Sequence, residues 1–302
     1  MAMRVATFAN NNAMLTSAMR VQAKMADLQL QQASGVKSTD YGGLGSSSRK
    51  LISLEVSLQQ SQAYSSAASE AAARVEVLYS AMSTVTDLLS DFRSQLAAMT
   101  GVDGATTSGA SLVDAAQAYM KELAGALNTQ YEGRYVFAGS RTTSPPVDLS
   151  GYASDADTPS TSYYQGDSIV SSVQVSAEQT VAYGVTADNP AFEKAFRALA
   201  LIANGGTPVD QANLQAASTL IVSALDEAAA VQSRLSISAS VLDRAKSNQS
   251  DYQSFLTTEM SSVRDVDATS VAVTLTSYET QLQASYAALA KIQSLNLLDY
   301  LR

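Results

Sequence analysis

The sequence predicts a mainly α protein: a long antiparallel coiled-coil helical bundle formed by its N- and C-terminal halves, with a small β-containing module inserted in the middle. Apolar residues recur in alternating steps of three and four in four separate segments, which is the spacing of coiled-coil helices. Each half has a short terminal stripe, a break and a long rod, so we expect the chain to run out along one set of helices and return beside it.

The N-terminal half begins with a stripe at Met14, Ala18, Val21, Met25, Leu28 and Gln32, followed by the loop 34–48. The longest stripe then runs from Leu54 to Met99, where Gly101 and Gly104 are expected to end the helix. Its first part offers mostly Ser and Ala, so residues 75–99 should hold most of the packing energy. A shorter helix is predicted from Leu112 to about Asn128.

The pattern changes period in the middle of the chain. Residues 131–139 are rich in aromatic and branched side chains, and residues 173–175 and 181–185 alternate as half-buried strands do. Pro145, Pro146 and Pro159 lie between them among Ser, Thr, Asp and Gly, a composition typical of loops and turns. A small β-containing module is therefore predicted here.

The returning half starts at Asn189-Pro190, a good cap and first helical residue, and this helix should stop at Gly205-Gly206. A second rod keeps one register over residues 214–245, and the register falters at Gln249. This change predicts a bend or a new packing partner. The last stripe reads Ala268, Val271, Leu275, Tyr278, Leu282, Ser285, Leu289 and Ile292, prolonged by Leu295, Leu298 and Leu301.

Three domains follow from this organisation. Residues 1–45 and 256–302 form a terminal coiled-coil assembly domain, residues 46–140 and 189–255 a helical rod domain, and residues 141–188 an outer β-containing module. The apolar stripes at both ends need a surface that covers them. The predicted assembly interface comprises Met14, Val21, Met25, Leu28, Val271, Leu275, Tyr278, Leu282, Tyr286, Leu289, Ile292, Leu295, Leu298 and Leu301.

Composition excludes several functions. The 302 residues include no His, Cys or Trp, and the formal net charge is -9. Most transition-metal sites lack their usual ligands, and scattered lysines in an acidic chain do not suit nucleic acid or anionic membranes. No metal or other cofactor is expected. We expect no membrane insertion and no cleaved secretory signal, since neither a long apolar run nor a basic leader is present.

Enzymatic patterns are weak. Residues 47–50 match the serine-x-x-lysine spacing of serine acyltransferases, but the companion SDN and KTG motifs are absent, so we interpret them as a helix start. Asp265, Asp267 and Glu259 are conceivable cation ligands, although acidic residues before a helix are better explained as caps. Tyr163, Tyr164 and Asp167 are either a recognition surface or, more economically, a turn closed by Gly166.

Several motifs nevertheless point to one family. SYETQLQASYAALAKIQSLNLLDYL at residues 277–301 resembles the C-terminal signature of flagellins and hook-associated junction proteins, and QASGVKSTDYGGLG at residues 32–45 is similar to the loop after their first helix. NTQYEGRYVFAGSRTTSPP at 128–146, YYQGD at 163–167 and NPAF at 189–192 resemble the hook-associated protein 3 branch, the hook-filament junction proteins.

The resemblance implies a structural adaptor with no enzymatic activity. Its partners would be other copies of itself in a ring or helical tube, another hook-associated protein, flagellin, and a flagellar export chaperone. It also implies an extracellular, flagellar location reached through type III export without a cleaved signal peptide. The alternatives are a filament-forming flagellin subunit and, remotely, an unrelated coiled-coil scaffold.

The state of the two ends in a single subunit has two possible descriptions. Short amphipathic helices are marginal alone, so residues 1–33 and 256–302 are expected to be largely disordered until neighbouring subunits cover them. The alternative is that the two ends pair with each other inside one subunit.

Overall fold

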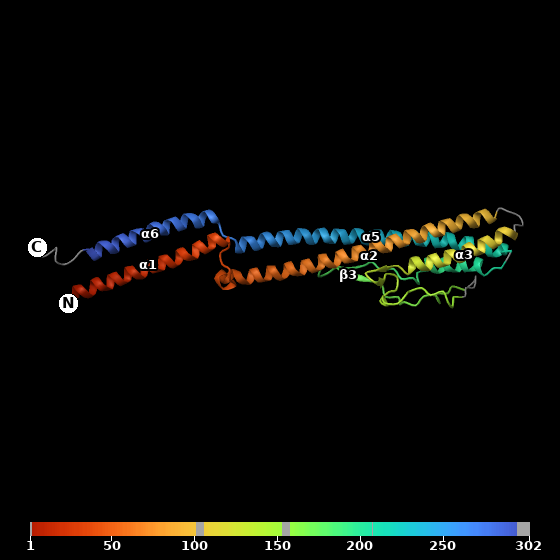
Figure 1. Ribbon diagram of the computed structural model, residues 1–302, viewed down its shortest axis with the longest axis horizontal. Coiled ribbons are helices and arrows are strands. Elements are labelled where there is room, and N and C mark those ends of the chain that lie inside the picture. Colours follow the sequence, from red (N-terminus) through yellow and green to blue (C-terminus); the bar gives the residue numbers. More distant parts are fainter. Residues whose placement is uncertain (1, 101–105, 153–157, 207, 295–302) are drawn as a thin grey trace. The chain divides into compact units, whose positions relative to one another are not determined.

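The computed structural model describes residues 2–100, 106–152, 158–206 and 208–294 of the chain. It is mainly helical (Figure 1), and its elements follow one another in chain order: α1 Ala2–Ser34, a 3₁₀ helix Tyr41–Ser47, α2 Ser48–Thr100, α3 Thr106–Leu127, β1 Gln130–Tyr131, β2 Arg134–Tyr135, β3 Ser172–Gln174, β4 Thr180–Ala182, α4 Pro190–Ala203, α5 Gln211–Arg264 and α6 Ala268–Ser294. The predicted mainly α class with a short β-containing insertion is confirmed. The predicted stops at Gly101 and Gly104 lie outside the described residues.

The chain divides into two compact units. One consists of Met1–Gln59 and Gln253–Arg302, and the other of Gln60–Tyr252. The predicted three-domain division stays a prediction.

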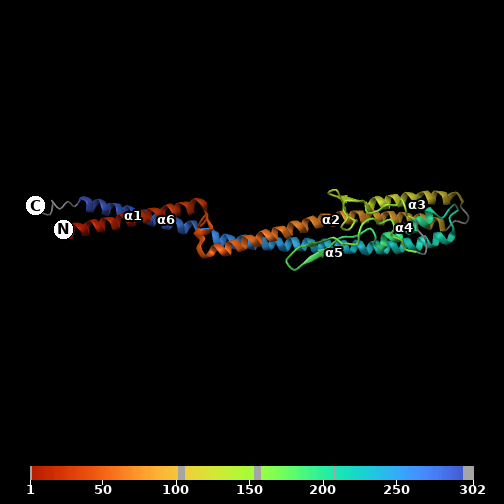
Figure 2. The ribbon, with the colours of Figure 1, turned by 90° about the horizontal axis from the view of Figure 1, so that it is seen from below.

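The larger unit has a core made by the predicted stripes. In this unit α2 lies beside the antiparallel α5 (Figure 2), and the two helices contribute to one buried core. The Ser61 hydroxyl of α2 also donates to the Gln249 side chain of α5 at 2.7 Å. Side chains of both stripes are buried, among them Val75, Leu78, Met82, Val85, Leu89, Phe92 and Leu96 of α2, and Leu214, Ile221, Val231, Leu235 and Leu242 of α5. The largest buried side chains of α2 lie after residue 75, where most of the packing energy was expected.

Two further helices complete this core. The ring of Tyr119 on α3 packs edge-on against Phe92, with 5.7 Å between their centroids. The Asn189 side chain accepts a hydrogen bond from the Ala191 amide at the start of α4, with Pro190 as the first helical residue, so the predicted cap is confirmed. Eleven residues of α4 are buried, and the helix packs against α3.

The β-containing part is less regular than predicted. Residues 131–139 form no continuous strand: β1 and β2 are two-residue strands joined through Glu132 and Gly133, both with positive φ. β3 and β4 form a second antiparallel hairpin, which places Val173 opposite Val181. Alternating apolar residues extend beyond these strands because Val175, Tyr183 and Val185 pack into the core as irregular chain.

Of the two alternatives at Gln249, the bend was wrong, because α5 continues unbroken to Arg264; the new packing partner is found for the stripe that follows, because α6 packs against α1. The Gln249 side chain accepts from the Ser61 hydroxyl and donates to the Val175 carbonyl at 2.8 Å. A polar residue thus interrupts the apolar stripe to satisfy groups on α2 and beside β3, without disturbing the helix backbone. The helix passes from one compact unit to the other at Tyr252–Gln253.

α5 also meets the length and composition of a membrane span, with one 18-residue window of mean hydropathy 1.2. Its apolar stripe is already covered by the core in this fold. Core helices meet the same criterion, so the window carries little weight as an indication of a membrane segment.

Candidate assembly interface

The two terminal helices pair with each other in the smaller unit. α1 and α6 lie side by side in both views (Figures 1 and 2) and run antiparallel, with the Lys24 ammonium 5.9 Å from the centre of the Tyr278 ring. Within residues 2–34 and 268–294, the structure therefore corresponds to the alternative in which the ends pair within one chain. Each of these amphipathic helices covers the apolar stripe of the other, which supplies the packing that a single helix lacks.

The predicted interface residues occupy this seam to different degrees. Val21 and Val271 are buried, as is Ala18, one turn before Val21 on α1. The half-buried members are Met14, Met25, Leu28, Leu275, Tyr278, Leu282 and Leu289. Tyr286 instead lies on the outer side of α6, with 49% of its surface exposed.

Four predicted positions near the C-terminus give less information. Ile292 is within α6, but its side chain is not described. Leu295, Leu298 and Leu301 lie outside the described residues. Their part in the predicted interface stays a prediction.

A second apolar stripe on α1 was missed in the sequence. Leu15, Met19 and Leu30 are 46%, 53% and 58% exposed, and the exposed Ala23 and Ala26 lie between them. At 100° per residue this outer stripe is about 140° from the seam, so α6 does not cover it. The signal was present as apolar residues one or two positions after seam members, but the seam itself accounted for the heptad pattern.

One of the three candidate acidic residues caps the start of α6. The Asp267 carboxylate accepts hydrogen bonds from the Thr269 and Ser270 amides at 2.9 and 3.3 Å. Asp265 instead lies in an isolated β-bridge, and Glu259 pairs with Lys50 at 2.9 Å. These three side chains therefore have separate structural roles in the described part of the chain.

The YYQGD motif braces the loops beside α4. Tyr163 is fully buried and donates to the Ala187 carbonyl at 2.9 Å, and burial raises the pKa of its hydroxyl. The Asp167 carboxylate accepts from the Ser140 hydroxyl and backbone amide and from the Ile169 amide. These bonds, those of Ser140 above all, lower the pKa of Asp167. Tyr163 and Asp167 are thus bonded to other parts of the same chain. This favours a structural role in the loops over a recognition surface for these two residues.

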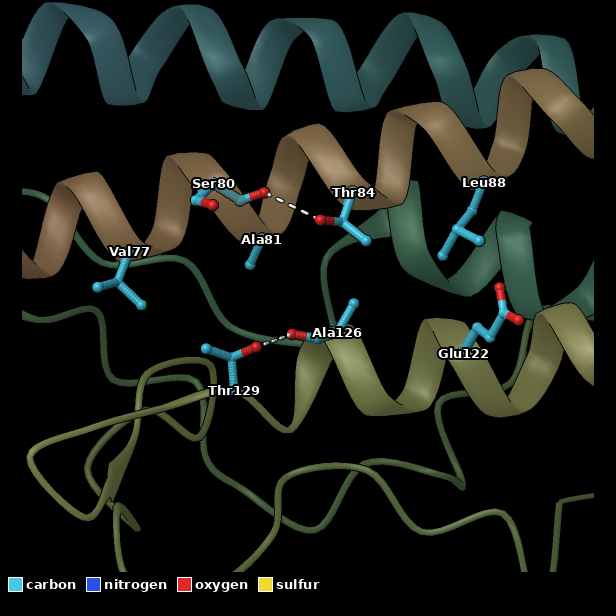
Figure 3. A pocket seen from close by; sticks show the side chains of 8 residues that line it. All are labelled: Val77, Ser80, Ala81, Thr84, Leu88, Glu122, Ala126 and Thr129. Carbon is cyan, nitrogen blue, oxygen red and sulfur yellow. Dashed lines mark hydrogen bonds between the residues drawn. The ribbon is translucent and has the colours of Figure 1, made fainter.

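An open groove of about 510 Å³ lies between α2 and α3 (Figure 3). Its lining is small and apolar for the most part: Val77, Ser80, Ala81, Thr84, Leu88, Glu122, Ala126 and Thr129. The Thr84 and Thr129 hydroxyls donate to the backbone carbonyls of Ser80 and Ala126. The groove thus offers an apolar surface and one carboxylate, without a nucleophile paired to a base.

The serine-x-x-lysine match lies where a helix begins, as interpreted from the sequence. α2 starts at Ser48, whose hydroxyl donates to the Gly45 carbonyl at 2.6 Å. The Lys50 ammonium donates to the Glu259 carboxylate on α5 at 2.9 Å. The residues serve the helix start and an exposed ion pair.

Fold and interface define a class: a helical structural protein that presents paired amphipathic terminal helices. The bacterial flagellin N-terminal helical region matches residues 5–142, and the bacterial flagellin C-terminal helical region matches residues 218–301. These two matches include most of the sequence and both halves of the helical bundle. The chain belongs to the flagellin family.

Solved structures share this fold at low sequence identity. A Vibrio parahaemolyticus protein assigned as a flagellar hook-associated protein has a TM-score of 0.61 and 16% identity, covering 72% of this chain and 97% of its own. The flagellar hook-associated protein 3 from Legionella pneumophila has a TM-score of 0.58, 15% identity, and coverage of 70% and 98%. FlgL from Bacillus cereus has a TM-score of 0.56, 13% identity, and coverage of 69% and 98%. No curated protein sequence matches the chain.

Proposed function

We propose that this protein is a structural adaptor at the hook-filament junction of a bacterial flagellum. It polymerises through its terminal helices and links the hook side to flagellin, without enzymatic activity. Its partners are other copies of itself, another hook-associated protein, flagellin and a flagellar export chaperone. It reaches the outside of the cell through the flagellar export channel without cleavage of a signal peptide.

One observation carries the proposal: the terminal pair has an apolar seam inside and a second apolar stripe outside. The seam is closed within one chain by Ala18, Val21 and Val271. The outer stripe at Leu15, Met19 and Leu30 remains exposed in the single chain. An exposed apolar stripe on a regular helix favours a protein partner. Contact between unlike faces of neighbouring subunits then builds a ring or tube.

The likeness of the fold to hook-associated protein 3 structures favours the junction over the filament. Family membership alone also suits a filament flagellin, which is the second candidate. The two differ in copy number, because a junction protein forms a ring while flagellin forms the whole filament.

Immunogold labelling and gene deletion separate these candidates. A junction adaptor should be labelled only at the hook tip, and its deletion should leave hooks that shed flagellin into the medium. Labelling along the whole filament would instead support the flagellin assignment.

Variants of α6 test assembly through the terminal pair. Replacing either half-buried seam residue, Leu282→Asp or Leu289→Asp, should block incorporation into flagella while the larger unit stays folded, because a carboxylate would be placed in the seam. Gln283→Asp adds the same charge at an exposed position of the same helix and is the matched control. Normal incorporation of both seam variants would contradict assembly through this pair.

A further inference from the structure

The C-terminal end of α5 is capped by a residue far away in the sequence. The last four carbonyls of a helix have no partner inside the helix and need donors from elsewhere. The Ser261 carbonyl accepts from the Asp265 amide at 2.7 Å. The other three accept from Lys37: its ammonium donates to the Ser262 and Val263 carbonyls at 3.0 and 2.9 Å, and its backbone amide to the Arg264 carbonyl at 2.8 Å.

The backbone around Lys37 is tied to the same place. Gly35 ends α1 with a φ of +71°, where its amide donates to the Gln31 carbonyl at 2.8 Å. The Gly35 carbonyl accepts from the Val266 amide at 3.0 Å, and Val36 pairs with Asp265 in an antiparallel bridge. One three-residue segment, 35–37, therefore ends α1, caps α5 and borders the start of α6.

The charge of Lys37 suits this position. The C-terminus of a helix carries partial negative charge, and an ammonium group there is stabilised by it. An ammonium has several donors and can serve two adjacent carbonyls at once. The linker between the end of α5 at Arg264 and the start of α6 at Ala268 has three residues, and the first of them, Asp265, is held in the bridge. Fixing the last turn of α5 thus limits the directions in which α6 can leave.

We propose that Lys37 is a positioning residue for the terminal pair. It holds the last turn of α5 against the end of α1, and so sets the direction in which α6 leaves and the register of α6 against α1. The outer stripe of α1 is then presented to neighbouring subunits beside an α6 helix in a fixed position. This role rests on the proposed function, in which the terminal helices carry assembly.

A distance measurement within the smaller unit tests the role of Lys37. The chain has no cysteine, so Thr258→Cys on α5 and Thr280→Cys on α6 can carry spin labels at two exposed positions. A single narrow distance distribution is expected with Lys37 and with Lys37→Arg, which keeps the charge and two donors. Lys37→Met should broaden the distribution and reduce incorporation into flagella at least threefold, without changing the helix content of the larger unit.

Lys50→Met is the matched control, because it removes an exposed lysine that also links the α2 and α5 segments of this unit but lies away from the helix end. The spin-label distance distribution of Lys50→Met should stay narrow. If Lys37→Met does not fold, Lys37→Gln with hydrogen exchange at the Val266 amide replaces it, and faster exchange is expected. An unchanged distribution, or unchanged exchange in the replacement, overturns the role of Lys37. Failure of Leu282→Asp to block incorporation would instead overturn assembly through the pair.

Discussion

Val21→Asp and Leu15→Asp place the same carboxylate on the two opposite sides of α1. Val21 is 8% exposed in the seam, and Leu15 is 46% exposed on the outer stripe. Removing a buried valine costs about 1.5–3 kcal/mol, and an unpaired polar group in its place adds about 1–3 kcal/mol, or more when the group is a charged carboxylate. Most other seam residues are only half-buried, so a loss of about 3 kcal/mol is comparable with the whole stabilisation of the pair.

Val21→Asp should therefore unfold the terminal pair, whereas Leu15→Asp should cost below about 1 kcal/mol, as surface changes usually do. Hydrogen-exchange mass spectrometry of the monomer measures this directly, together with far-UV circular dichroism, because α1 and α6 contain 33 and 27 helical residues. Both variants should fail to assemble, for different reasons. The reasoning is refuted if Val21→Asp keeps wild-type protection in α1 and α6, or if Leu15→Asp loses it.

Two predictions concern the loops beside α4. Gly139→Ala should lower the thermal midpoint, with a loss of about 1–3 kcal/mol, because Gly139 has a φ of +68° and a Cβ there would collide with the Asp167 carbonyl and carboxylate; an unchanged midpoint in calorimetry would contradict this collision. The pKa of Asp167 is lowered by bonds from Ser140, so its stabilisation is full above the ordinary aspartate pKa of about 4 and is lost as the pH falls through the lower folded value. The midpoint difference between wild type and Asp167→Asn should accordingly shrink on acidification, and a difference that grows instead would show that the sign is wrong.

Local periodicity was enough to predict the helices. The stripe from Val75 to Leu96 is buried along one face of α2, and Asn189-Pro190 starts α4. Both signals depend only on residues within a few turns of each other, through helical spacing and a local side-chain cap. Strands were predicted less well, because Tyr183 and Val185 alternate like strand residues yet lie beyond the end of β4, in irregular chain that packs into the core.

Two polar residues show why contacts between distant segments could not be predicted from local periodicity. Gln249 looked like a break in the stripe, but it bonds to Ser61 and to the Val175 carbonyl. Lys37 looked like an ordinary loop residue, but it caps carbonyls 225 and 226 positions away. The bonding groups in both cases come from segments that the sequence does not place near them, so no local spacing indicates the partner.

The sequence by itself determined the helical class, the seams of the four long stripes and the family resemblance, since each depends on side-chain type at short spacing. Only the tertiary structure decided that α1 pairs with α6 inside one chain, which leaves Leu15, Met19 and Leu30 outside. It also decided that residues 35–37 bind the end of α5. The physical reason is that a heptad stripe specifies a face that must be covered, while the covering surface depends on which distant segments the folded chain brings together.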